Sequence, residues 1–208
     1  MEKLSRYEFK YLINQKLSEV IQDEIKHFMI NDDYSDSNNS YFVRSLYFDN
    51  KNNTCFYEKA DGMRSRSKFR LRSYSKKFYL EKDKLFFLEE KGRIKERTFK
   101  RRIRLDYTDY DLILNNQNIN YLIKKYDNLI LKKYFYTCFR KFLRPTILVD
   151  YLRKPFISKN GLYFRLTFDS NIKSCKSDSL IDTQKFKWLD CKSGYVIMEL
   201  KFERSIPM

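Results

Sequence analysis

The sequence predicts an α+β fold in which a mostly antiparallel sheet closes into a β-barrel tunnel with flanking helices. About eight short segments alternate apolar and polar residues with the period of a strand, and a few longer ones have helical spacing. The polar face of nearly every predicted strand is ionised, with Lys and Arg far in excess of acids. Closing the sheet into a barrel would remove its edges and enclose that charged face as a lumen.

The predicted elements follow one another along the chain with few breaks. The strands are expected at residues 6–13, 41–49, 65–75, 85–92, 95–105, 146–156, 162–169 and 195–203. A first helix follows the first strand and is capped by Asn14. A helical region is expected at 106–142 and ends before Pro145, which cannot continue a helix. Asn160-Gly161 is a strong turn signal between two of the later strands.

Composition limits the class of protein. A chain of 208 residues is long enough for one domain with a substantial core. The formal net charge of +16 favours a polyanionic partner such as polyphosphate, nucleic acid or an anionic membrane surface. The cysteines are scattered and contain no CxxC pair, which argues against a disulfide framework or a zinc site. With no apolar leader and no apolar run long enough to span a membrane, we expect a cytoplasmic protein.

Polar residues, most of them ionised, are spaced two apart in most predicted strands, so they share one face of each strand. The groups are Glu8 and Lys10; Lys68, Arg70 and Arg72; Glu89 and Lys91; Lys100, Arg102 and Arg104; Tyr151 and Arg153; Tyr163 and Arg165; Glu199 and Lys201. A sheet face exposed to solvent would explain the ionised residues of any single strand. The excess of cations over acids favours an inward face, because solvated surfaces usually mix both signs.

Crowding these cations together is unfavourable unless a polyanion neutralises them. A carboxylate beside a phosphate chain is repulsive unless a divalent metal ion lies between them, bound by oxygens of both. We therefore expect Mn²⁺ or Mg²⁺ with Glu199 as the first candidate ligand. Glu8 and Glu89 are further candidates, and either is equally suited to pair with a neighbouring lysine.

Several short motifs occur in an order that resembles a known family. They are Arg-Tyr-Glu-Phe-Lys-Tyr at 6–11, Ser-Leu-Tyr-Phe-Asp-Asn at 45–50, Phe-Arg-Leu-Arg-Ser-Tyr at 69–74, Phe-Leu-Glu-Glu-Lys at 87–91, Phe-Lys-Arg-Arg at 99–102, Val-Asp-Tyr-Leu-Arg-Lys-Pro-Phe at 149–156, Arg-Leu-Thr-Phe-Asp at 165–169 and Val-Ile-Met-Glu-Leu-Lys-Phe at 196–202. Together they resemble the VTC catalytic domain, the polyphosphate polymerase branch of the triphosphate tunnel metalloenzymes.

The resemblance implies an eight-stranded antiparallel tunnel formed by one domain, residues 1–208, with helices outside. It implies transfer of the γ-phosphoryl group of ATP to a polyphosphate chain, with Mn²⁺ or Mg²⁺. Glu199 would be the metal ligand and Tyr151 a wall residue near the phosphates. The phosphate-binding residues would be Lys10, Arg70, Arg72, Lys91, Lys100, Arg153 and Arg165. Arg102 and Lys201 join these candidates because they share the same strand faces.

The sequence departs from the family at its end. Family members usually continue into a helix with a Ser-Lys-aromatic motif, and this chain ends at Pro207-Met208 without one. The C-terminal tunnel helix is therefore expected to be missing or shortened. A catalytically idle polyphosphate-binding module remains an alternative for that reason.

Two other functions remain open. A tunnel triphosphatase or nucleotide hydrolase would share nearly all of these residues. Such relatives usually open with Glu-x-Glu-x-Lys, whereas this chain has Arg6 before Glu8 and Lys10, which favours a longer anion. A nucleic-acid-binding module would need aromatics and cations on one face, and Phe69 and Leu71 are predicted to oppose the arginines. Specific nucleic-acid binding is therefore not expected, and the sequence leaves the oligomeric state open.

Overall fold

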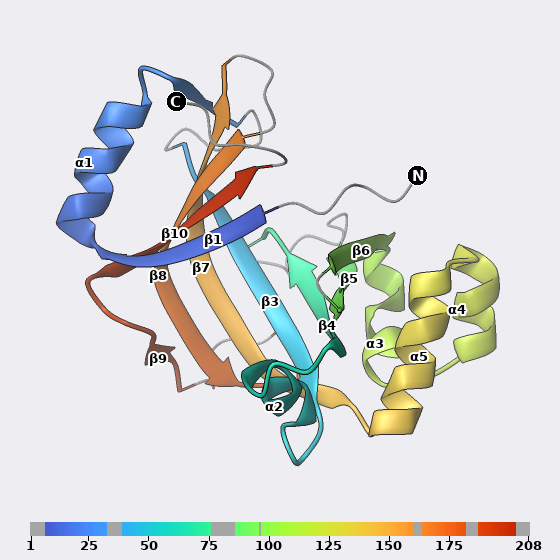
Figure 1. Ribbon diagram of the computed structural model, residues 1–208. Coiled ribbons are helices and arrows are strands. Elements are labelled where there is room, and N and C mark those ends of the chain that lie inside the picture. The colour runs from blue at the N-terminus through green and yellow to red at the C-terminus, as the bar shows by residue number, and fades with distance from the viewer. Residues whose placement is uncertain are drawn as a thin grey trace. The chain divides into compact units, whose positions relative to one another are not determined.

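The computed structural model describes residues 7–32, 39–75, 86–95, 97–159, 164–181 and 187–202 (Figure 1). These residues form five α-helices and a large antiparallel sheet of ten strands, so the predicted α+β class is confirmed. Among the described residues, no helix is both long and apolar enough to cross a membrane.

The sheet carries most of the described chain. Its strands are β1 (Tyr7–Asn14), β2 (Met29–Asn31), β3 (Tyr41–Asp49), β4 (Ser65–Ser73), β5 (Phe86–Ile94), β6 (Arg97–Leu105), β7 (Arg144–Ser158), β8 (Phe164–Lys176), β9 (Leu189–Asp190) and β10 (Tyr195–Phe202). Their order across the sheet is β1-β10-β8-β7-β3-β4-β5-β6, with β2 beside β7 and β9 beside β8. Strands distant in the sequence, such as β1 and β10, therefore become neighbours.

The described helices are short, and two of them begin after an asparagine whose side chain caps the first turn. They are α1 (Gln15–Ile25), α2 (Thr54–Ala60), α3 (Tyr110–Leu114), α4 (Ile119–Tyr126) and α5 (Leu129–Lys141), with a 3-10 turn at Tyr107–Asp109 before α3. Asn14 caps α1 as predicted, because its side chain accepts a hydrogen bond of 2.8 Å from the Leu17 amide. The helical region expected at 106–142 is interrupted at Asn116, Asn118 and Asp127, which have positive φ. Asn and Asp tolerate that conformation better than most residues.

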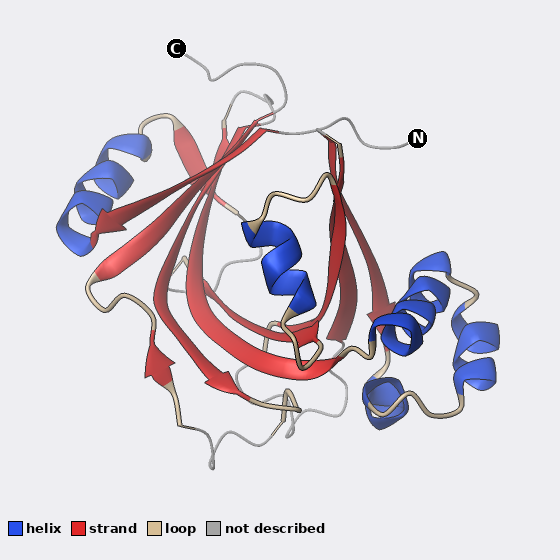
Figure 2. Ribbon diagram, turned by 60° about the horizontal axis from the view of Figure 1, so that its bottom comes forward, coloured by secondary structure: helices blue, strands red, loops and turns tan. Residues whose placement is uncertain are grey.

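The chain divides into two compact units, and three long strands, β3, β7 and β8, contribute residues to both. The second unit comprises the described parts of Arg44–Val149 and Ser174–Trp188. In it, Leu46, Leu71, Leu88 and Ile103 form one buried row across β3, β4, β5 and β6. Figure 2 shows α3, α4 and α5 gathered beside the β5–β6 end of the sheet. Tyr110 of α3 and residues of α5 belong to the same core as that row, so the opposite face of these strands carries the ionised residues.

The first unit comprises the described parts of Met1–Val43, Asp150–Lys173 and Leu189–Met208. Its core contains Met29, Phe156, Leu166, Phe168 and Val196, and Ile21 and Ile25 of α1 pack against it. β1 differs from the other long strands because nearly all of its side chains are exposed on both faces. It lies at the end of the strand order, where a second neighbouring strand is lacking among the described residues.

Several predicted boundaries were wrong. β8 continues to Lys176, past the strand end predicted at residue 169. The short strands β2 and β9 were not predicted, and α2 lies in the connection between two predicted strands. Strands of two or three residues are too short for a hydrophobic period to reveal them. Predictions for Arg6, Tyr163, the Asn160-Gly161 turn and residues 203–208 lie outside the described residues.

Candidate functional site

In the second unit, cations stand in rows across β4, β5 and β6. The strand register gives three adjacent rows: Lys68, Lys91 and Lys100; Arg70, Glu89 and Arg102; Arg72, Phe87 and Arg104. Tyr47 and Ser45 of β3 extend the last two rows beside Arg70 and Arg72. Phe69 and Leu71 are fully buried on the opposite face. The prediction that these cations share one face of the sheet is confirmed. We call the residues of these three rows, together with Tyr47 and Ser45, the Glu89 cluster.

Glu89 is the carboxylate at the centre of this cluster and is fully buried. One of its oxygens, Oε2, accepts hydrogen bonds from Arg70 Nε at 2.8 Å and Arg70 Nη2 at 2.5 Å. Its Oε1 lies 2.7 Å from Lys100 Nζ. Burial opposes ionisation of Glu89, but Arg70, Arg72 and Lys100 outweigh it and lower its pKa to about 2. Glu89 is therefore an ionised counter-charge at neutral pH.

Cations exceed carboxylates in this cluster, and this excess of positive charge lowers the pKa values of two lysines. Burial, together with repulsion from Arg72 and Arg70, lowers the pKa of Lys100 to about 8 even though Glu89 opposes the change. Burial also lowers the pKa of Lys68, with Lys59 and Arg70 adding to the effect. The site would gain stability from an added anion, because an anion would favour the charged form of each lysine.

Aromatic rings lie on the same face as these cations. The Arg102 guanidinium lies 4.7 Å from the centre of the Phe87 ring, and that of Arg72 lies 5.6 Å from the Tyr74 ring. The expectation that aromatics oppose the cations therefore holds for Phe69 but not for these rings. Such contacts stabilise closely spaced guanidinium groups.

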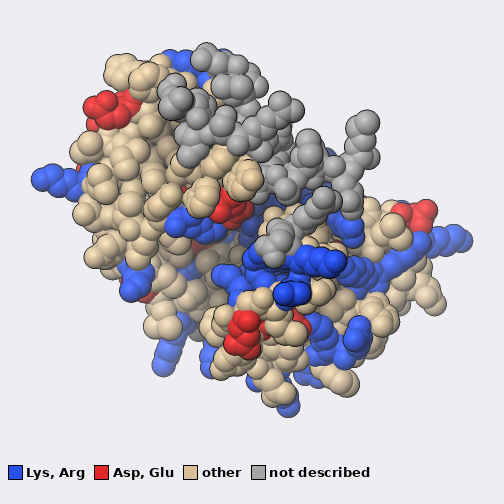
Figure 3. All heavy atoms as spheres, viewed as in Figure 1, with Lys and Arg blue, Asp and Glu red and all other residues tan. Residues whose placement is uncertain are grey.

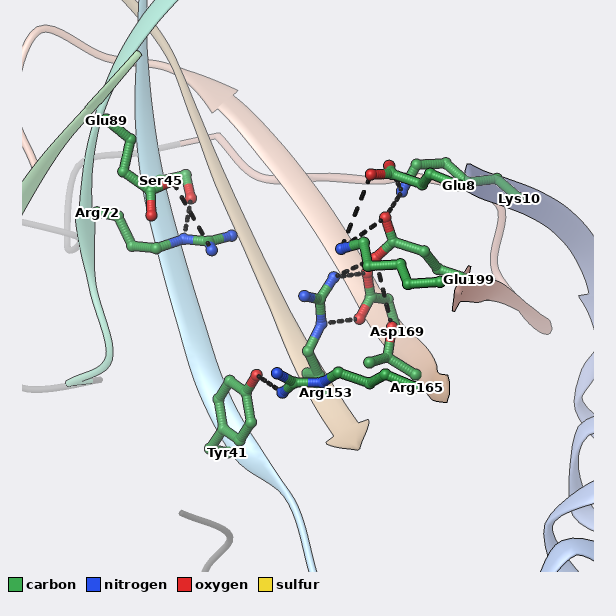
Figure 4. Close-up of polar contacts among 12 residues, drawn as sticks. Glu8, Lys10, Tyr41, Ser45, Arg72, Glu89, Arg153, Arg165, Asp169 and Glu199 are labelled. Atoms are coloured by element: carbon green, nitrogen blue, oxygen red, sulfur yellow. Dashed lines mark hydrogen bonds and ion pairs between the residues drawn. The ribbon is translucent and has the colours of Figure 1, made fainter. Parts of the chain in front are cut away.

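The first unit holds a second polar cluster, formed mainly by β1, β8 and β10 (Figure 4). Its register places Lys10 beside Glu199 and Thr167 in one row, and Glu8 beside Lys201 and Arg165 in the next. Arg153 of β7 reaches the same group through its contacts with Asp169 and Glu199. We call these residues the Glu199 cluster: Glu8, Lys10, Arg153, Arg165, Thr167, Asp169, Glu199 and Lys201.

Glu199 is buried, and both of its oxygens face donors. Its Oε1 accepts a hydrogen bond of 2.6 Å from Lys10 Nζ and lies 3.1 Å from Lys201 Nζ. Its Oε2 accepts a hydrogen bond of 3.3 Å from Arg153 Nη2. Burial opposes ionisation, but the adjoining Glu8 carboxyl and the charges of Lys201, Lys10 and Arg153 hold the pKa of Glu199 well below its ordinary value.

Arg153 is held by a carboxylate that the sequence analysis missed. Asp169 accepts a two-pronged contact from Arg153, with both donor–acceptor distances 2.6 Å. The Arg153 guanidinium also lies 5.3 Å from the centre of the Tyr151 ring. Burial opposes its charge, but Asp169 outweighs that effect and raises the pKa of Arg153 above its ordinary value. The signal was present in the sequence, since Asp169 shares the period-two face of Arg165 and Thr167.

Arg165 has a donor that none of the described residues satisfies. Its Nη2 lies 3.0 Å from Asp32 Oδ2 and 3.5 Å from the Tyr41 hydroxyl. Its Nε is buried and has no hydrogen-bond partner in the described part of the chain. An orphaned N–H group is costly, and an anion oxygen is a suitable acceptor for it.

The donor set limits how a metal ion could be held. The described residues contain no group of three or more His, Cys, Asp or Glu side chains arranged to bind one. Glu199 and Glu8 both contact Lys10 and Lys201, which are long side chains able to turn aside. These two carboxylates fit a metal ion that takes its remaining ligands from bound phosphates, as Mg²⁺ commonly does. Glu89 fits less well, because the arginines around it are buried and fixed.

Solved structures of other proteins share this fold. Two are proteins named "putative adenylate cyclase": the Bacillus halodurans protein has a TM-score of 0.54 and 12% identity over 98% of this chain and 83% of that one. The Vibrio parahaemolyticus protein has a TM-score of 0.50 and 11% identity over 98% and 78%. HpAC1 from Hippeastrum has a TM-score of 0.51 and 12% identity over 97% and 80%. At such low identity the likeness shows the fold alone.

Residues 5–208 match the VTC domain, and this chain therefore belongs to the VTC domain family. The resemblance inferred from the short motifs is confirmed. No curated protein sequence matches the chain.

Proposed function

We propose that this chain is a metal-dependent polyphosphate polymerase that transfers the γ-phosphoryl group of ATP to a polyphosphate chain. The observation that carries the proposal is the set of cation rows on one face of β4, β5 and β6, which a single buried carboxylate cannot neutralise. The eight-stranded tunnel formed by one domain at residues 1–208, the use of ATP and a cytoplasmic location are part of the same proposal.

The residue types suit phosphoryl transfer. Arg70 and Arg72 present guanidinium groups that grip phosphate oxygens with paired hydrogen bonds. The lysine row of Lys68, Lys91 and Lys100 offers point charges that hold a phosphate chain less rigidly. Transfer through a loose transition state depends on such positioning and charge neutralisation. Since the acceptor phosphate is already anionic, a general base is not required, and the single histidine of the chain, His27, belongs to neither cluster.

In this proposal Glu199, with Glu8 as a second ligand, would hold Mn²⁺ or Mg²⁺, which would supply charge neutralisation for the bound phosphates. Lys10 and Lys201 would donate to phosphate oxygens in place of Glu199. Arg153 remains fixed by Asp169, and Tyr151 supports its guanidinium. Arg165 contributes the N–H group that lacks a partner among the described residues.

Hydrolysis of a short substrate is the second candidate. HpAC1, which shares the fold, is described as having a dominant triphosphatase activity. The pairing of Glu8 with Glu199 around Lys10 would serve that reaction equally well. Incubation with ATP and Mn²⁺, followed by gel analysis, separates the functions. Long phosphate chains support the polymerase, inorganic phosphate alone supports the hydrolase, and binding without turnover supports an idle binder.

A matched pair of variants on β6 tests the binding face itself. Arg102 lies on the cation face, whereas its neighbour Arg101 points to the other side and lies 5.0 Å from the Phe99 ring. Arg102→Gln and Arg101→Gln change the net charge equally. We expect Arg102→Gln to weaken inorganic triphosphate binding about 10-fold, as for a lost hydrogen bond to a charged group, and Arg101→Gln to leave it unchanged. Equal effects in calorimetric titrations would contradict a face-specific site.

A further inference from the structure

Tyr47 of β3 lies beside Arg70 in the Glu89 cluster, and its role is not explained by packing. Its hydroxyl oxygen accepts a hydrogen bond of 2.8 Å from Arg70 Nη1. Lys68 Nζ and the Arg70 guanidinium carbon lie 5.5 and 5.6 Å from the centre of its ring. Its chain neighbours Leu46 and Phe48 are buried in the core on the opposite face. The phenol ring is therefore directed into the cation face.

The Tyr47 hydroxyl has a hydrogen to donate, and its surroundings consist of donors. From β4, the charged groups nearest to it are Arg70, Arg72 and Lys68. The Oε2 atom of Glu89 on β5 already accepts hydrogen bonds from the Arg70 guanidinium. The contact from β7 is made by the Thr146 hydroxyl, which donates to the Tyr47 backbone carbonyl. Among the residues that the structure describes, the Tyr47 hydroxyl hydrogen meets no acceptor.

A phosphate oxygen would meet this need and would bring the negative charge that the neighbouring cations require. We propose that Tyr47 is a further phosphate-binding residue, whose hydroxyl donates to the same phosphate group that Arg70 binds while it accepts from Arg70 and fixes that side chain. This inference rests on the proposed function, because it assumes that the Glu89 cluster binds phosphates.

The charge around Tyr47 gives the inference a measurable consequence. Burial opposes ionisation of the phenol, but Arg70, Arg72 and Lys68 outweigh it and hold the pKa of Tyr47 below its ordinary value. The hydroxyl can donate to phosphate only while it is protonated. A phosphate accepting that hydrogen stabilises the protonated phenol and repels the phenolate, so binding raises the pKa of Tyr47 and weakens as Tyr47 ionises.

The first experiment is a calorimetric titration of the whole chain with inorganic triphosphate at neutral pH. We expect Tyr47→Phe to weaken binding about 10-fold, the effect of one lost hydrogen bond to a charged group. Tyr57→Phe is the matched control, since Tyr57 is an exposed tyrosine of α2 outside both clusters. We expect Tyr57→Phe to bind as the wild type does, and thermal melts of both variants to match the wild type.

The second experiment follows the phenolate absorption of the wild type minus that of Tyr47→Phe as pH rises. With triphosphate added, the Tyr47 transition should move to higher pH, because a phosphate beside the hydroxyl disfavours the phenolate. Wild-type binding together with unchanged binding by Tyr47→Phe and an unmoved transition would overturn this inference alone. Absence of triphosphate binding by the wild type would overturn the proposed function and this inference with it.

Discussion

Glu89 and Glu199 are both buried carboxylates surrounded by cations, but the side chains that pair with them differ in how easily they can move away. The nearest partners of Glu89 include two buried arginines, whereas Lys10, the closest partner of Glu199, has a side chain that is 51% exposed. A buried guanidinium cannot turn away without leaving charges unpaired. An exposed lysine can exchange its carboxylate for another anion at little cost. We therefore assign Glu89 to structure and keep Glu199 as the proposed metal ligand.

Removal of the Glu89 charge should destabilise the fold. Glu89→Gln leaves buried cations without their counter-charge, and we expect the free energy of unfolding to fall by about 3–5 kcal/mol. Urea denaturation measures the change, with Glu19→Gln on the exposed face of α1 as the control. That control should lie within about 0.5 kcal/mol of the wild type.

The same variant should show a defined pH dependence. The pKa of Glu89 is lowered from 4.5 to about 2 by folding, so its contribution to stability is complete above 4.5 and is lost as pH falls towards 2. The wild type should therefore lose its advantage over Glu89→Gln across this interval. A difference that stays constant down to pH 2 would show that Glu89 is not ionised in the folded protein.

Glu199→Gln tests the proposed metal ligand. The amide keeps an oxygen in place but removes the charge, and we expect metal-dependent turnover to fall about 100-fold, equivalent to a few kcal/mol of charge stabilisation. Glu58→Gln, which alters a carboxylate paired with Lys141 outside both clusters, is the control. Unchanged Mn²⁺ dependence of turnover in Glu199→Gln would remove Glu199 from this role.

The site residues show which features the sequence could predict and which it could not. The faces that hold Lys68, Arg70 and Arg72 follow from a period of two within one strand. The partners Asp169 and Tyr47 depend on which strands are neighbours and in which register. Asp169 is only 16 residues from Arg153, and Tyr47 is 23 residues from Arg70, but a period within one strand does not give the pairing between strands. The contact between Lys10 and Glu199 joins segments 189 residues apart. The sequence therefore predicted the cations better than the groups that orient them.

At the scale of elements, the β5–β6 pair depends on one close contact. Gly92 of β5 pairs with Phe99 of β6, and a Cβ added at Gly92 would overlap the Phe99 ring. The ring cannot move freely, because Arg101 and Lys133 lie over it at 5.0 and 5.4 Å. A glycine here lets the hairpin place Lys91 and Lys100 directly opposite each other on the other face.

Gly92→Ala should therefore destabilise the protein by about 1–3 kcal/mol, the usual cost of overpacking. Replacing the ring in the double variant Gly92→Ala/Phe99→Leu should recover part of the loss. Denaturation of both single variants and the double variant completes a double-mutant cycle. Strictly additive losses would show that the Phe99 ring is not the obstacle.

Elements were predicted well where strand-favouring residues run together, and poorly elsewhere. β3 has the bounds expected from the sequence, because β-branched and aromatic residues such as Tyr41, Phe42 and Val43 recur along it until Asp49. β8 runs past its predicted end through Asn171 and Lys173, which are polar residues typical of loops. Pairing with a neighbouring strand overrides such local preferences.

At the scale of the whole molecule, the net charge of +16 attracts any polyanion. Figure 3 shows Lys and Arg side chains outnumbering acidic ones on the face it draws. General attraction and specific binding should differ in their response to salt. Exposed charges are screened within about 10 Å at 0.1 M salt, whereas buried ones such as Arg70 are screened much less.

We therefore expect RNA binding to weaken roughly 1,000-fold between about 50 and 200 mM salt, as for a protein that contacts several backbone phosphates. Triphosphate binding should weaken much less over the same interval. Filter binding and calorimetry measure the two quantities under matched conditions. Equal salt dependence would mean that triphosphate is held by the surface field and not by the clusters.

β7 supplies Leu148 to the core of the second unit and Phe156 to that of the first, with Arg153 between them. Side chains alternate along a strand, so one inserted or deleted residue would reverse the facing of everything that follows, unless a bulge absorbed it. This stretch can accumulate substitutions over evolutionary time, but its length is constrained. Natural variation in β7 should therefore preserve the spacing from Leu148 to Phe156 even where the amino acids themselves have changed.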